Sequence, residues 1–209
     1  MVQRLVPVIM IAALGMIDSV AQPKALPPDA VDWRQGVVVA HVVSKVDIDQ
    51  RGTPVHRESG SVVSLNRGRI HAYHRARELA VEHIARLARE IRIDADTMLS
   101  ELIEENETVQ KRLANVIASR VKVREYPTGF AETMCRAELK IGDLLLAVPY
   151  SYPGDEFPVR IDNPIPTRYT SLVVDTRGLH VEPMILPSVY NENGLEVYGR
   201  NYVDIRYAG

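Results

Sequence analysis

This 209-residue chain lacks a second cysteine and a surplus of basic charge, and each absence excludes a class of protein. Because Cys135 is the single cysteine, no intramolecular disulfide can form and stability must come from an ordinary hydrophobic core. A lone cysteine in an apolar pattern is usually a small core residue. The net charge is −2 and no basic patch stands out, so we expect no nucleic-acid partner, which would be held mainly by Lys and Arg.

The sequence also lacks the motifs by which enzymes and cofactor-binding proteins are usually identified. Its glycines do not form a phosphate-binding spacing, and no serine lies in a nucleophile elbow. Asp47 and Asp49 alternate at the end of an expected strand, but no twelve-residue calcium loop follows them. We therefore expect a protein that is not an enzyme and that carries no cofactor.

Long apolar runs are absent after the N-terminus, so we expect no membrane span in the rest of the chain. The N-terminus itself has Arg4, an uncharged apolar run over residues 5–17 and small residues at positions 19 and 21. A helix over that run would rise only about 20 Å, short of the roughly 30 Å hydrocarbon core. The pattern predicts a cleavable signal peptide over residues 1–21, with a retained anchor or a buried core helix as the alternatives.

Export is the consequence of that signal peptide. We expect a protein of the periplasm or one associated with the outer membrane, and peripheral membrane association remains open. No cysteine stands near the cleavage site, so a lipid-anchored form has no attachment residue.

Composition divides the mature chain into four parts. We expect an extended leader over residues 22–33, an α+β domain over 34–148, a proline-rich linker over 149–166 and a β-rich C-terminal segment over 167–209. The α+β domain is predicted to pack an antiparallel sheet on two helices.

The domain is predicted to begin with a strand over residues 34–49 and a long helix over about 66–91, capped by Ser64 or Asn66. The apolar residues of that helix recur at helical spacing and include several alanines, which would let it lie close to a sheet. They are Ala72, Ala76, Leu79, Ala80, His83, Leu87 and Ile91. A second helix is expected over about 97–118, with Asp94 or Asp96 as its cap.

A β-hairpin is predicted next, from strands over residues 120–126 and 130–141. The second strand alternates strictly, so one face should be dry and the other wet. If this strand lies at the sheet edge, it could pair with another chain. Further strands are expected over 170–175 and 181–190, and Asn193-Gly194 predicts a turn from which 195–198 pairs back.

The sharpest candidate for chemistry is a metal site formed by His71, His74 and Glu78. Their spacing of i, i+3 and i+7 places them on one side of the long helix, where they could share a metal with a fourth ligand from elsewhere. The alternative, which we favour, is a solvated helix face that carries two histidines. His83 lies on the apolar stripe and is expected to be a satisfied core histidine.

Several sequence blocks carry a resemblance to a known family. They are AYHRARELA over residues 72–80 after an extended strand, FAET over 130–133, YTSLVVDTRGL over 169–179, PMILP over 183–187 and NGLEVYG over 193–199. The order of these blocks resembles the bacterial twenty-kilodalton surface lipoprotein family, which includes FlgP-like flagellar outer-membrane proteins. The resemblance implies an envelope protein, often oligomeric, and it brings no catalytic residues with it.

Together these observations favour a noncatalytic structural or adaptor protein of the cell envelope, associated with flagellar or outer-membrane assembly. Its expected partners are itself, as a homo-oligomer, or other envelope proteins. The alternative is a periplasmic module that binds a small ligand, and a metal-dependent enzyme ranks third. A pocket with convergent polar groups would favour the module, whereas an exposed apolar patch or an unpaired sheet edge would favour assembly.

Overall fold

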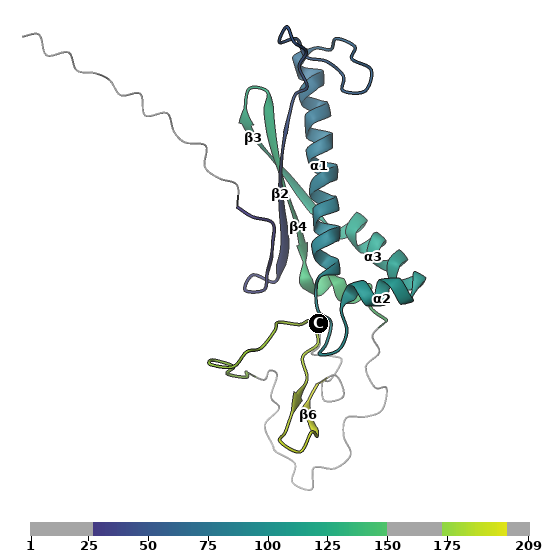
Figure 1. The fold of residues 1–209 in the computed structure, drawn as a ribbon, viewed down its shortest axis with the longest axis vertical. Coiled ribbons are helices and arrows are strands. Elements are labelled where there is room, and N and C mark those ends of the chain that lie inside the picture. The colour runs from purple at the N-terminus through teal and green to yellow at the C-terminus, as the bar shows by residue number, and fades with distance from the viewer. Residues whose placement is uncertain (1–26, 150–172, 200–209) are drawn as a thin grey trace, which may run out of the picture.

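The computed structural model describes residues 27–149 and 173–199, which form an antiparallel sheet packed against helices and a small C-terminal hairpin (Figure 1). The first part contains β1 (Ala30–Asp32), β2 (Val37–Lys45), α1 (Leu65–Arg89), α2 (Leu99–Glu105), α3 (Glu107–Arg120), β3 (Lys122–Gly129), β4 (Glu132–Lys140) and the 3-10 helix η1 (Ile141–Leu146). The second contains β5 (Val189–Tyr190) and β6 (Glu196–Tyr198). The predicted α+β class is confirmed. We call residues 29–148 the α+β body and residues 173–199 the C-terminal segment.

The sheet has the spatial order β1-β2-β4-β3, and all its pairings are antiparallel. Cross-strand partners such as Ala40 and Ala137, or Val42 and Cys135, lie opposite each other on the face that α1 covers. The predicted dry face of β4 is confirmed, since Thr133, Cys135, Ala137 and Leu139 are all buried. The core therefore lies between this face and the helices.

α1 lies along the sheet because small residues let its backbone approach closely. Ser64 caps the helix, since its Oγ accepts a hydrogen bond from the Arg67 backbone N–H. Gly68 faces β2 so closely that a Cβ there would stand 2.6 Å from Cγ1 of Val46. The buried face of α1 matches the predicted stripe at its alanines, but Leu79 is exposed and Ile84 is fully buried. The stripe is therefore turned slightly from its predicted position.

The second predicted helix is two helices, which corrects the prediction of one continuous element. α2 ends at Glu105, and α3 begins at Glu107 after Asn106, whose backbone is extended. The Asn106 side chain caps α3 by accepting a hydrogen bond from the Thr108 N–H at 2.9 Å. The apolar stripe continues across the break, which explains why apolar periodicity did not reveal it.

The sheet begins inside the predicted leader. Ala30–Asp32 form β1 and pair with β2, and Pro28 stands two residues before this strand. The Asp29 carboxylate accepts a hydrogen bond from the His41 backbone N–H at 2.7 Å and lies 2.7 Å from Nδ1 of His83 on α1. Asp29 thus ties the start of the chain's described part to both the sheet and α1.

The C-terminal segment is less regular than predicted. Residues 173–175 are not a strand, and within 181–190 only Val189–Tyr190 are, because Pro183 and Pro187 interrupt the run. The hairpin at Asn193-Gly194 is confirmed, with Gly194 at a φ of 75°. The segment meets the body where the Ile185 and Leu186 N–H groups bond to the carbonyls of Arg92 and Ile93.

The predicted signal peptide and most of the predicted linker lie outside the described residues. Among the residues that the structure describes, no helix is both long enough and apolar enough to cross a membrane.

Candidate functional site

The residues of the predicted metal site do not come together. His71 turns toward the loop before α1, where its ring meets that of His56 edge-on with centroids 4.9 Å apart. His74 and Glu78 instead line a shallow surface hollow on α1 with Arg77. Within the described residues, no three His, Cys, Asp or Glu side chains are placed to share a metal ion.

His83 is not the core histidine that the sequence predicted. Its side chain is partly exposed, and its Nδ1 pairs with the Asp29 carboxylate, which Arg86 also approaches at 4.0 Å. The Asp29 partner comes from 54 positions earlier in the chain, so helical spacing alone gave no signal for it.

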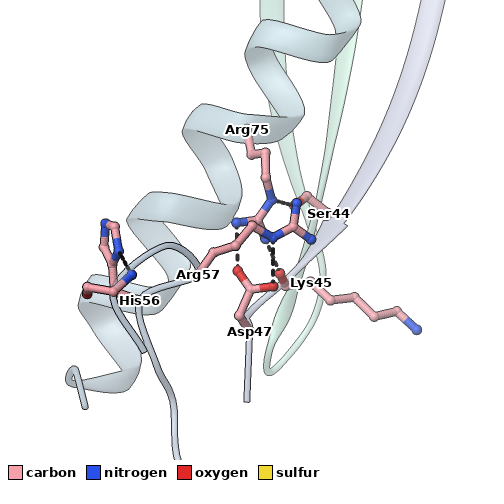
Figure 2. A network of polar contacts seen from close by, with 7 residues as sticks. Ser44, Lys45, Asp47, His56, Arg57 and Arg75 are labelled. Carbon is pink, nitrogen blue, oxygen red and sulfur yellow. Dashed lines mark hydrogen bonds and ion pairs between the residues drawn. The ribbon is translucent and has the colours of Figure 1, made fainter. Parts of the chain in front are cut away.

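An arginine on α1 organises the loop that joins β2 to α1. Arg75 donates from Nε to Ser44 Oγ at 3.1 Å, from one terminal nitrogen to Asp47 at 2.7 Å and from the other to the Lys45 carbonyl at 2.6 Å (Figure 2). Arg57 reaches the same Asp47 carboxylate from the loop at 3.3 Å. Each of the three guanidinium nitrogens of Arg75 thereby donates one hydrogen bond, which fixes the loop's first residues against α1.

This network also explains Asp47, for which the sequence showed only that no calcium loop follows it. Its two carboxylate oxygens are taken by two arginines, so it has the character of a structural anchor. Ser44, the interruption in the alternation of β2, is buried and serves as an acceptor for Arg75. The sequence signal for this contact was Ser44 itself, a polar residue at a position where the alternation of β2 predicts an apolar one.

A cleft lies where the C-terminal segment meets the turn between α1 and α2. Its volume is about 390 Å³, within the range of small-molecule sites. Ile93, Leu102, Val148 and Leu186 provide apolar wall, while Asp94, Asp96, Thr97, Ser188, Tyr190 and Glu196 provide polar groups. Much of that polar capacity is already used: Asp94 accepts from two backbone N–H groups, and Glu196 accepts from the Ser188 hydroxyl at 2.9 Å.

β4 is not an edge strand, which corrects the expectation that it could pair with another chain. It lies between β2 and β3, so both its sides are used within the sheet. The edges are β1 and β3. The β3 edge carries Lys122, Arg124 and Pro127, which are features that oppose indiscriminate strand pairing.

Exposed apolar side chains gather in the C-terminal segment. Val173 is 89% exposed, and the others with large exposed surfaces are Val174, Leu179, Val181, Tyr190, Leu195 and Val197. In the longer α+β body, by contrast, most large apolar residues are buried. The C-terminal segment therefore exposes a larger share of its apolar residues than the body does, and exposed apolar surface is the feature that the sequence analysis associated with assembly.

Within the described ranges, few groups have a shifted pKa. Burial lowers the pKa of His41, Arg136 adds to that effect, and Asp29 and Glu138 oppose it. Burial raises the pKa of the Cys135 thiol, with a further contribution from Glu125, so this thiol is an inert core group. The hydrogen bonds from Arg177 lower the pKa of the exposed Asp175.

In the comparison with known proteins, the match found covers the C-terminal end of the chain. Residues 171–209 match the family model of the second domain of the Treponema pallidum protein Tp0624. Comparison with curated proteins and with solved structures gave no match. The match includes the C-terminal segment, in which most large apolar side chains are exposed.

Proposed function

We propose that this protein is a noncatalytic, exported component of the cell envelope that works by assembling with itself or with other envelope proteins. The observation that carries the proposal is the apolar surface of the C-terminal segment. The resemblance to FlgP-like proteins adds flagellar or outer-membrane assembly as the setting.

Physical reasoning supports an assembly role for this segment. A two-stranded hairpin has too little core to be stable alone, and β5 and β6 are only two and three residues long. Apolar patches of this kind on soluble proteins usually mark surfaces that a partner covers. An assembly contact needs buried interface area and neither a pocket nor a reacting group.

Sedimentation of the mature chain tests this proposal. We expect a species larger than the monomer at tens of micromolar protein. Replacing Val173, Leu179 and Val181 together by serine should convert it to monomer, while Leu146→Ser, an exposed apolar residue on η1, should leave the assembly intact. A monomeric wild-type chain that also captures no envelope protein in pull-downs would contradict the proposal.

A second candidate function, binding of a small ligand, rests on the cleft between the body and the C-terminal segment. The cleft has the volume and mixed lining of a ligand site, although several of its polar groups are bonded to each other. Native mass spectrometry of protein taken from envelope extracts would detect a bound small molecule. Loss of that mass in Leu186→Trp, which narrows the cleft, with unchanged sedimentation would favour this function over assembly.

A further inference from the structure

We propose that the end of the molecule where α1 begins docks onto an anionic lipid surface. We call this end the α1 N-terminal surface and define it as residues 45–75, which hold the loop after β2 and the first turns of α1, together with residues 129–132 at the turn between β3 and β4. Figure 1 shows these three parts at the same end of the body, away from α2, α3 and the C-terminal segment.

The surface exposes large apolar side chains from each of its three parts. Phe130 at the hairpin turn is 75% exposed, and Val62, Ile48 and Ile70 are also exposed. Phe130 and the start of α1 are held together, because Arg69 lies over the Phe130 ring at 4.7 Å and donates to its carbonyl at 2.6 Å. Their relative placement is therefore fixed by contacts from both elements.

The charge of this end is opposite to that of the chain as a whole. The chain has a net charge of −2, whereas residues 45–75 with 129–132 carry six basic side chains and four acidic ones. The basic residues are Lys45, Arg51, Arg57, Arg67, Arg69 and Arg75, and the acidic ones are Asp47, Asp49, Glu58 and Glu132. This end is positive, which complements an anionic surface.

Three of those cations have no acidic partner within the described part of the chain. Asp47 is taken by Arg57 and Arg75, and Glu132 pairs with Lys45. Arg51, Arg67 and Arg69 make no ion pair among the described residues. Arg67 and Arg69 also stand in the first turns of α1, where the helix dipole disfavours a cation and no acidic residue is present.

Exposed apolar side chains interspersed with unpaired arginines fit the interface of a bilayer that contains anionic lipid. There the apolar groups enter the headgroup region and the cations meet lipid phosphates. A protein partner would more often take an apolar centre with a polar rim, whereas here Arg69 precedes the exposed Ile70 in α1 and lies over the exposed Phe130. Docking at this end leaves the C-terminal segment free, so the proposal is independent of assembly.

Vesicle flotation with the mature chain tests this inference. We expect binding to vesicles of phosphatidylcholine with a quarter phosphatidylglycerol, weak binding to phosphatidylcholine alone, and release by 0.5 M salt. Removal of one arginine should weaken binding about fivefold, so Arg67→Gln is the electrostatic variant. Phe130→Ser and Ile70→Ser should weaken binding without changing its salt dependence.

Matched controls stand at the opposite end of the body. Leu146→Ser removes from η1 an apolar side chain that is as exposed as Ile70, and Arg112→Gln removes an exposed cation from α3. Both variants should bind as wild type does. Circular dichroism confirms that each variant is folded. The inference is overturned if the two vesicle types bind equally, if Arg67→Gln and Phe130→Ser bind as wild type, or if Phe130→Ser instead changes the sedimenting mass without vesicles.

Discussion

The α+β body and the C-terminal segment differ in how far they bury their large apolar side chains. In the body, isoleucine, leucine and valine side chains are enclosed between α1 and the sheet, and every strand of the sheet has at least one partner. The C-terminal segment leaves most of its large apolar residues in solvent. It contacts the body through two backbone hydrogen bonds, the Arg92–Glu182 ion pair, and Ile185 and Leu186, which pack against the core.

That difference indicates which part of the chain stabilises the fold and which part is available to contact a partner. A chain that buries its apolar residues gains most of its stability internally, whereas a segment that exposes them can gain the same stabilisation only from a partner. The body should therefore fold by itself, and the C-terminal segment should become ordered and stable through contact. Substitutions of the same type in the two regions should then have very different effects on the free energy of unfolding.

The largest difference is expected for truncation of an apolar side chain. Ile84 is fully buried in the body, so Ile84→Ala should lower the free energy of unfolding by about 2–5 kcal/mol. Leu179 is exposed in the C-terminal segment, so Leu179→Ala should change it by less than about 0.5 kcal/mol in the monomer. Urea denaturation followed by circular dichroism measures both. Similar costs at the two positions would mean that the C-terminal segment contributes to the body's core.

Overpacking of the contact between α1 and the sheet should come next in size. Ala80 is fully buried, so Ala80→Leu should cost about 1–3 kcal/mol because α1 and β4 must move apart. Ala76→Leu should behave alike. Arg77→Ala, on the exposed side of the same helix, should cost less than about 0.5 kcal/mol. Thermal denaturation of the three variants gives the comparison, and equal costs would show that the helix face is assigned wrongly.

The sequence predicted the regular part of this body because its signals are local and periodic. The alanines of α1 and the alternation of β4 each specify structure within a short stretch of chain, as does the Asn193-Gly194 turn in the C-terminal segment. The break at Asn106 was missed although Asn, followed by Glu107 and Thr108, is a recognisable cap. β1 was missed because three residues contain no period, and its place depends on pairing with β2.

Long-range placement could not be predicted from such signals. The alternation of β4 does not show that β2 pairs along the side of β4 opposite β3, so the sequence left open whether β4 is an edge strand. The spacing of His71, His74 and Glu78 predicted a shared helix side, but it could not show that His56 from the loop would approach His71. Ser44, Asp47 and Arg75 meet across about thirty positions, which no local pattern encodes.

Two ion pairs of nearly equal length sharpen the comparison between the regions. Arg75–Asp47 measures 2.7 Å with side chains 21% and 25% exposed, whereas Arg177–Asp175 measures 2.6 Å with side chains 91% and 59% exposed. Arg75→Met should cost about 1–3 kcal/mol because Asp47, Ser44 and a carbonyl lose their donor in a half-buried site. Arg177→Met should have little effect, since solvent and salt screen an exposed pair.

Urea denaturation of these two variants at low and high salt is the measurement. We expect the Arg75→Met deficit to persist in 0.5 M salt, because a partly buried site is screened less than an exposed one. Limited proteolysis should also cut the loop over residues 46–64 faster in Arg75→Met. If both arginines contributed equally, hydrogen-bond length rather than burial would decide the worth of these pairs.

The smallest expected effect is a pH dependence of stability that originates in the body at His41. Burial lowers the pKa of His41, and the Arg136 charge lowers it further, so the folded state holds this ring neutral to lower pH than the unfolded chain does. Its Nδ1 is buried and has no hydrogen-bond partner within the described residues, which agrees with a neutral ring. Between the lowered pKa and the ordinary value of about 6.5, the unfolded state binds more protons, so stability falls as pH decreases through this window.

We expect His41→Gln to flatten this part of the stability profile in urea denaturation between pH 7 and 5. His180→Gln, a replacement at an exposed histidine of the C-terminal segment, controls for the substitution itself and should retain the wild-type slope. An unchanged slope in His41→Gln would show that acid sensitivity arises elsewhere, with the Asp29–His83 pair as the next group to replace.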